Sequence, residues 1–138
     1  GSEMCIRDRI TAVASSKPWP LVHKILKDFS FTSYFDVIVG SNPSDEMKNK
    51  ADFDQKTRII KKTFIKLKEI GMTPALDEKF LSSTIMIGDK NYDIFGAKAN
   101  KITSAGAAWG YGSLDELADA GADFIFKTPH DLQDFLLT

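Results

Sequence analysis

Three short segments of the chain carry the residue types that phosphate and metal chemistry requires. Ser15 and Ser16 supply two hydroxyls, Lys56 supplies an ammonium, and Asp89 and Asp93 supply two carboxylates four residues apart. A hydroxyl beside the free amides of a helix N-terminus can hold a phosphate oxygen, and a lysine adds a positive charge there. Two carboxylates on a loop that enters a helix suit Mg²⁺, which binds one or two carboxylates and keeps several waters. The set therefore predicts a site for Mg²⁺ and a phosphate ester.

The hydrophobic pattern places these segments at strand ends and helix starts. Residues 10–14 form a β-prone run before the two serines, and Pro18 is expected to open a helix. Residues 84–87 form a continuous apolar run before Gly88, which is typical of a strand buried on both faces of a parallel sheet. Ligands of open α/β sheets bind beyond the C-terminal ends of the strands. We therefore expect the candidate residues along that edge.

The whole chain alternates strand and helix patterns, which indicates the α/β class with a parallel sheet covered by helices on both faces. Ser113 with Glu116, and Thr128 with Pro129, have the spacing of helix starts, and Gly71 can end a long amphipathic helix. The predicted strands are 10–14, 36–40, 84–87, 102–108 and 122–127, and the predicted helices are 18–28, 52–70, one through Ile94 and Ala97, and those after Ser113 and Thr128.

Composition excludes several classes of protein. The 138 residues are 43% hydrophobic and 27% charged, as expected for one globular domain that folds without a metal or disulfide. The formal charge of −1 argues against a nucleic-acid or membrane partner. Apolar runs are far shorter than the ~20 residues that cross a bilayer. A single cysteine, Cys5, excludes a disulfide framework, so the expected location is cytoplasmic.

The first nine residues are set apart from the fold. Gly1 and Ser2 resemble a cloning scar, and residues 4–9 resemble a translated sequencing adaptor. We therefore expect 1–9 to be an artefactual leader and 10–138 to form the domain, with a short disordered leader as the alternative. In either case Cys5 is a poor candidate nucleophile.

The order of the candidate segments resembles motifs two, three and four of the haloacid dehalogenase-like phosphohydrolases. Residues 13–17, Lys56, and 86–89 with Asp93 carry this likeness, and 34–41 and 106–113 resemble the phosphoglycolate phosphatase-like branch. The resemblance runs from Ile10 to the C-terminus. It implies a Rossmann-like core, Mg²⁺, and hydrolysis of a small phosphorylated metabolite through a phosphoaspartyl mechanism.

The resemblance also implies a role for each candidate residue. Ser15, with Ser16 beside it, would bind the transferring phosphate, and Lys56 would neutralise it. Asp89 would ligate Mg²⁺, and Asp93 would support a ligand or a metal-bound water. The loop before Lys56 is long, so two other lysines remain alternatives for the phosphate lysine: Lys48 and Lys50.

The sequence departs from the family at its first motif, Asp-x-Asp-Gly-Thr, which supplies the nucleophile and the general acid and base. The motif is absent, and the only aspartate before residue 10 is Asp8. Covalent phosphoryl transfer needs a carboxylate in line with phosphorus, so this chain alone is expected to be inactive. By the same resemblance it lacks the first central strand and the cap. Two strand edges would then lack a partner, which favours self-association.

Other functions remain open beside the hydrolase. The alternative is a non-catalytic domain that binds phosphate or metal, or a half-enzyme completed by a partner that supplies the first strand. A signalling receiver domain uses similar residue types, but its acidic residues come first and its lysine last. Phosphoglycolate, a sugar phosphate or a nucleotide would each satisfy the candidate site. The remaining conspicuous side chains are interpreted as structural: Trp19, His23, Trp109 and His130.

Overall fold

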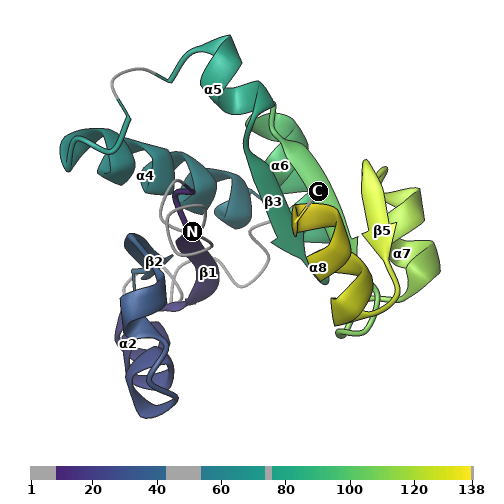
Figure 1. The fold of residues 1–138 in the computed structure, drawn as a ribbon, viewed down its shortest axis with the longest axis horizontal. Helices are drawn as coiled ribbons and strands as arrows, with labels where there is room; N and C mark the ends of the chain where they lie inside the picture. The colour runs from purple at the N-terminus through teal and green to yellow at the C-terminus, as the bar shows by residue number, and fades with distance from the viewer. Residues whose placement is uncertain (1–8, 43–53, 74–75, 138) are drawn as a thin grey trace. The chain divides into compact units, whose positions relative to one another are not determined.

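The computed structural model describes residues 9–42, 54–73 and 76–137, which belong to two compact units. Residues 1–76 are the N-terminal unit and residues 77–138 the C-terminal unit (Figure 1). Each unit contains one parallel β-sheet, which confirms the α/β class predicted from the sequence. Cys5, Asp8, Lys48 and Lys50 lie outside the described residues.

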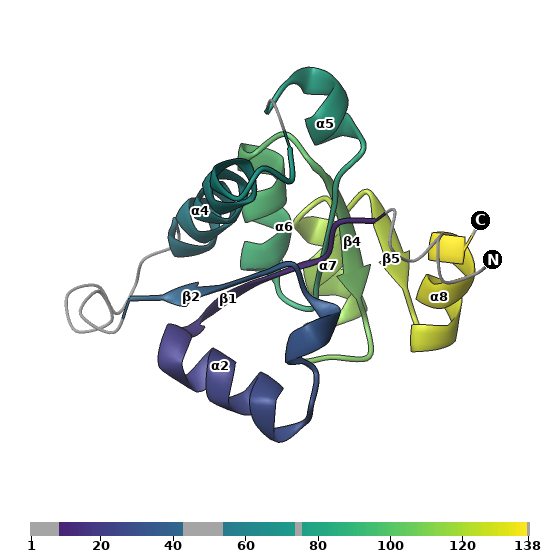
Figure 2. The ribbon, with the colours of Figure 1, turned by 60° about the vertical axis from the view of Figure 1, so that its left-hand side comes forward.

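The N-terminal unit is a two-stranded parallel sheet between two helices. Its elements are β1 (Ala12–Pro18), α2 (Trp19–Asp28), the short 3₁₀ helix η1 (Thr32–Tyr34), β2 (Val37–Ser41) and α4 (Gln55–Glu69). Figure 2 shows α2 and α4 on opposite sides of the sheet. The apolar face of α4 is buried through Ile59, Ile60, Phe64 and Leu67. The helix ends before Gly71, whose φ of 79° suits the left-handed turn that closes helices.

The end of β1 differs from its prediction. The strand continues to Pro18, and α2 starts at Trp19 instead of Pro18. A residue that precedes proline is driven toward extended backbone, and this keeps Lys17 in the strand. The pairing with β2 is irregular between Ala14 and Pro18, so Ser15 and Ser16 lie in a strand end that has left the regular ladder.

The C-terminal unit is a three-stranded parallel sheet in the order β3-β4-β5. Ile94, Leu117 and Ala120 form its buried core, against which Ala108, Ala122 and Ile125 pack. Its elements are α5 (Glu78–Ser82), β3 (Ile85–Gly88), α6 (Asn91–Ala99), β4 (Thr103–Ala107), α7 (Leu114–Asp119), β5 (Phe124–Phe126) and α8 (Pro129–Leu137).

Two features of this unit were not predicted. β3 was expected to be buried on both faces, but its residues are half-buried and Ile87 is 39% exposed. The reason is that, among the described strands, β3 pairs with β4 alone and forms an edge of its sheet. The five-residue helix α5 was missed because it is too short to show a helical period. No helix of the described residues is long and apolar enough to cross a membrane.

Candidate active site

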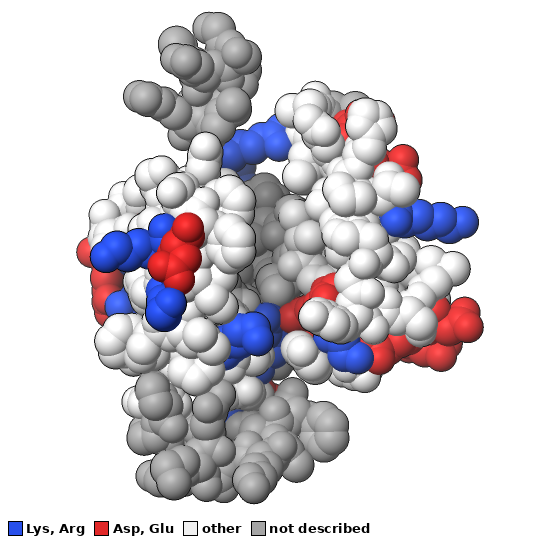
Figure 3. Space-filling view, turned by 90° about the horizontal axis from the view of Figure 1, so that it is seen from below, with Lys and Arg blue, Asp and Glu red and all other residues white. Residues whose placement is uncertain are grey.

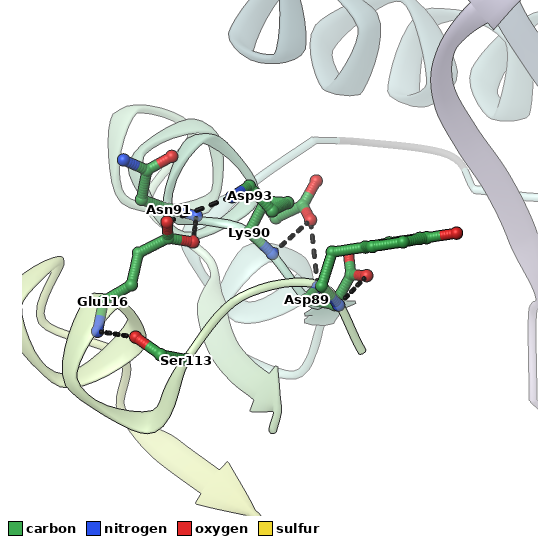
Figure 4. Close-up of polar contacts among 7 residues, drawn as sticks. Asp89, Lys90, Asn91, Asp93, Ser113 and Glu116 are labelled. Atoms are coloured by element: carbon green, nitrogen blue, oxygen red, sulfur yellow. Dashed lines mark hydrogen bonds and ion pairs between the residues drawn. The ribbon is translucent and has the colours of Figure 1, made fainter. Parts of the chain in front are cut away.

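The carboxylate of Asp93 holds the loop that follows β3. Its Oδ2 accepts hydrogen bonds from the backbone N–H groups of Asp89 and Lys90, both at 3.1 Å (Figure 4). Asp93 is the third residue of α6 and is only 4% exposed. A carboxylate in the first turn of a helix satisfies free amides and is favoured by the helix dipole. Asp93 therefore fixes the backbone that carries Asp89.

A second loop contacts Asp89 from the end of β4. The backbone N–H of Tyr111 donates to Oδ2 of Asp89 at 3.0 Å. Glycine permits this approach, because a Cβ at Gly110 would lie 2.5 Å from the Cβ of Asp89. A Cβ at Gly88 would lie 2.3 Å from the Cβ of Asp93. Side chains at these two positions would force the loops apart, so both glycines are needed for the geometry of the carboxylates.

An ion pair lies beside the carboxylates. Oε1 of Glu116 is 3.0 Å from Nζ of Lys90, and Oε2 accepts from the backbone N–H of Asn91 at 3.1 Å (Figure 4). The hydrogen bond to Glu116 raises the pKa of Lys90 above its ordinary value of 10.5, although desolvation opposes this. Lys90 therefore carries a positive charge next to Asp89 at neutral pH.

Three further residues belong to this site although no sequence motif indicated them: Lys90, Tyr111 and Glu116. The three-residue spacing of Ser113 and Glu116 correctly indicated a helix start, since Ser113 Oγ accepts from the backbone N–H of Glu116 at 3.0 Å. That spacing describes the backbone of Glu116. It contains no information about its carboxylate, which reaches a loop 25 residues earlier in the chain.

Tyr92 is the other titratable group at this loop. Burial raises the pKa of its hydroxyl above the ordinary value of 10.0, and the negative charges of Asp93 and Asp89 raise it further. The hydroxyl is therefore protonated at neutral pH and can serve as a hydrogen-bond donor.

The carboxylates fit Mg²⁺ by chemical type. Mg²⁺ takes oxygen ligands and is usually held by one or two carboxylates with water completing its shell. Asp89 in the loop after β3 and Asp93 in the first turn of α6 supply that number. Within residues 9–42, 54–73 and 76–137 there is no group of three or more His, Cys, Asp and Glu side chains that could hold a metal. A cation here would thus depend on the carboxylates of Asp89 and Asp93 and on non-protein ligands.

The N-terminal unit contains the candidate phosphate residues. Nζ of Lys56 donates to the backbone carbonyl of Ala14 at 2.6 Å, across 42 residues of sequence, and Lys56 is 7% exposed. The lysine is thus brought to β1 next to Ser15. Oγ of Ser15 accepts from the backbone N–H of Lys17 at 3.1 Å, a local role that a purely structural serine would also have. Ser16 is half-buried beside it.

The structure thus describes the predicted site residues as two sets, each within its own unit. Lys56 lies against β1 beside the two serines in the N-terminal unit. Asp89 and Asp93 are joined through hydrogen bonds of one loop in the C-terminal unit. By chemical type the first set suits an anion and the second a cation, and the binding itself stays a prediction.

The sequence of the chain is similar to those of known proteins. The model of the haloacid dehalogenase-like hydrolase family matches residues 7–107. The chain is 31% identical over 117 residues to the tyrosine-protein kinase PtkA of Mycobacterium tuberculosis, an alignment that covers 85% of this chain and 32% of the kinase. It is 27% identical over 120 residues to the phosphoglycolate phosphatase of Salmonella paratyphi A, covering 87% of this chain and 41% of the phosphatase.

The fold of the chain also matches solved structures. A structure from Clostridium acetobutylicum, described as a predicted phosphatase, superimposes with a TM-score of 0.73 at 30% identity. The match covers 99% of this chain and 56% of that chain. The present sequence therefore spans less than half of the two curated relatives and little more than half of this solved structure.

Proposed function

The chain belongs to the haloacid dehalogenase-like hydrolase family, and we propose that it is part of the catalytic core of a Mg²⁺-dependent phosphate-monoester hydrolase. The substrate we propose is a small phosphorylated metabolite of the phosphoglycolate type. The likeness to the Salmonella phosphoglycolate phosphatase supports this choice. The observation that carries the proposal is the loop after β3, where Asp93 fixes the backbone of Asp89 through two hydrogen bonds.

Each candidate residue has a role in this proposal. Asp89 is the carboxylate that faces the cation, and Asp93 is a positioning residue that holds the Asp89 backbone. Bound Mg²⁺ would supply positive charge that offsets the charge of the phosphate. Ser15, with Ser16 beside it, donates a hydrogen bond to a phosphate oxygen, and Lys56 neutralises its charge. Lys48 and Lys50 remain alternatives to Lys56 in this last role.

We propose that the present chain is inactive by itself. The resemblance assigns the nucleophile to an aspartate-rich first motif, which this sequence does not contain. Without an attacking carboxylate, binding and positioning alone do not form a phosphoaspartyl intermediate. The missing carboxylate would come from a segment encoded upstream or from a partner chain.

The test starts with the coding sequence upstream of Ile10. The chain should be expressed with its encoded upstream segment, and hydrolysis of p-nitrophenyl phosphate should be measured with and without Mg²⁺. We expect activity that requires Mg²⁺ in the extended protein and none in the 138-residue chain. Asp89→Asn should reduce kcat/KM at least 100-fold, because it removes the carboxylate charge that faces the cation.

Asp119→Asn is the matched control, because this aspartate is exposed at the end of α7 and lies outside the loop. It should leave kcat/KM within twofold. A native start codon next to Ile10, or an extended protein that binds phosphate without turnover, would reject the hydrolase. Such a result would support the non-catalytic binding domain instead.

A further inference from the structure

A concave site lies in the N-terminal unit beside β2. The cavity has a volume of about 220 Å³ and is lined by Trp19 and His23 of α2, by residues 38–40 of β2, and by Lys62 and Lys66 of α4. None of the serine, lysine and aspartate residues proposed for hydrolysis lines it. The cavity is therefore a separate feature of the molecule.

The cavity contains two positive charges that no acidic side chain among the described residues neutralises. Lys62 and Lys66 are four residues apart on one face of α4, where like charges repel each other. The side-chain ammonium of neither lysine forms a hydrogen bond or ion pair with another described residue, and no acidic residue is among the lining residues. α4 as a whole has six basic residues and one acidic residue. A bound anion would relieve this repulsion.

The same cavity presents an aromatic surface. Trp19 is 52% exposed, and its ring meets that of His23 edge to face at a centroid distance of 6.0 Å. The backbone at Trp19 is held against β2, since a Cβ at Gly40 would lie 2.6 Å from the Cα of Trp19. The backbone of Trp19 is thus held in place, while about half of the residue is exposed to solvent. Exposed aromatic rings of this kind stack against the flat faces of bases.

From these observations we propose that the cavity binds a nucleoside monophosphate. The base stacks on Trp19, and the phosphate lies near Lys62 and Lys66 with His23 as a further donor. The volume is below the roughly 300–1,000 Å³ of sites that enclose drug-sized ligands, which disfavours any ligand larger than a mononucleotide. The sequence led us to interpret Trp19 and His23 as structural residues. The proposal gives each of them a ligand-binding role as well.

Isothermal titration of the 138-residue chain with AMP, in buffer with EDTA, tests the proposal. AMP should bind saturably, and adenosine and inorganic phosphate should each bind at least tenfold more weakly. The double variant Lys62→Gln/Lys66→Gln should weaken AMP binding at least tenfold, and Trp19→Leu at least fivefold. Ser15→Ala should bind AMP as the parent chain does, which separates this cavity from the proposed catalytic site.

Lys61→Gln/Lys68→Gln is the matched control, because it removes the same charge from exposed positions of the same helix outside the cavity. It should leave AMP affinity within twofold, and far-UV circular dichroism should show unchanged helix content in every variant. Equal loss in both double variants would mean general charge attraction and would reject the site. Absence of AMP binding, with Lys62→Gln/Lys66→Gln causing dimerisation in sedimentation, would also reject it. In that case the lysines protect the edge of β2 from strand pairing.

Discussion

The two units differ in both charge and the way in which their polar groups are held. The N-terminal unit has 13 Lys and Arg against 9 Asp and Glu, a formal charge of +4, whereas the C-terminal unit has 5 against 10, a charge of −5. Figure 3 shows the largest group of acidic side chains on the visible face over the C-terminal unit. The near-neutral total charge thus hides a basic composition in one unit and an acidic composition in the other.

The candidate residues follow the same division. In the C-terminal unit, carboxylates accept backbone hydrogen bonds from neighbouring loops, so the site is part of the local fold. In the N-terminal unit, the contact of Lys56 joins α4 to a strand 42 residues earlier. The comparison teaches that the cited contacts of the carboxylate site span 3 to 25 residues of sequence, whereas the Lys56 contact of the N-terminal unit spans 42. Four substitutions or conditions test this difference.

The largest effect is expected from Asp93→Ala. The change leaves two backbone N–H groups at a buried position without their acceptor and should lower the free energy of unfolding by about 3 kcal/mol. Urea-induced unfolding measures this value. Asp119→Ala, at an exposed position, should change it by less than about 0.5 kcal/mol. If Asp93→Ala lowers the free energy of unfolding only slightly, the carboxylate does not organise the loop. The contrast between the two units would then lose its support in the C-terminal unit.

A smaller effect is expected from Lys56→Met in the N-terminal unit. The change removes the hydrogen bond to the carbonyl of Ala14 and keeps most of the apolar stem, so we expect a loss of about 1.5 kcal/mol. The exposed Lys61→Met is the control in the same urea titration. If Lys56→Met is more stable than the parent, the buried ammonium is a burden to the fold. That outcome would leave ligand binding as the only role of Lys56 and would strengthen the contrast between the two units.

Ser113→Ala tests the local caps of the C-terminal unit. Side chains of Asp77, Ser113 and Thr128 accept bonds at the starts of α5, α7 and α8, whereas α2 and α4 have no side-chain cap bond within the described residues. Loss of the Ser113 cap should cost about 1 kcal/mol by thermal unfolding. Ser33→Ala, at an exposed position in η1, should have no measurable effect. Equal losses would contradict the stronger local organisation of the C-terminal unit.

The smallest effect is an alkaline loss of stability in the C-terminal unit. Lys90 and Tyr92 both have folded pKa values above their ordinary values of 10.5 and 10.0. Both groups therefore bind their protons more tightly in the folded state, and their contribution is present at lower pH and lost as pH rises through the folded pKa values. As the pH rises above these ordinary values, the Tm should fall more steeply in the parent than in Lys90→Met. Identical slopes would mean that the ion pair with Glu116 does not contribute.

The sequence predicted the sheet and its helices well where local signals agreed. Gly71 ends α4, and Ser113 and Thr128 cap their helices, because these devices act through neighbours in the chain. The apolar run 84–87 correctly indicated a strand but not its exposure. Burial depends on which strands lie beside it, and β3 is at an edge. The prediction of one domain over 10–138, with self-association through open strand edges, stays a prediction.

The candidate site was predictable only in part for a similar reason. Asp89 and Asp93 are close in sequence, and their spacing across a strand-to-helix loop indicated a shared role. Tyr111 and Glu116 reach that loop through the connection after β4, and no spacing in the sequence reveals this contact. The roles of Ser15, Ser16 and Lys56 in phosphate binding also stay predictions, because Ser15 and Lys56 have structural contacts that would exist without a ligand.

The consecutive strand order of the C-terminal unit has a consequence for folding kinetics. Ile85 pairs with Thr103 and Ala105 with Phe124, so each strand meets the next one along the chain after a single helix. Closing such short loops loses little chain entropy, and low contact order is associated with fast folding. The N-terminal unit must close a longer segment before Lys56 reaches β1. We therefore expect the C-terminal unit to form first after dilution from denaturant, with its central β4 amides the earliest to resist hydrogen exchange.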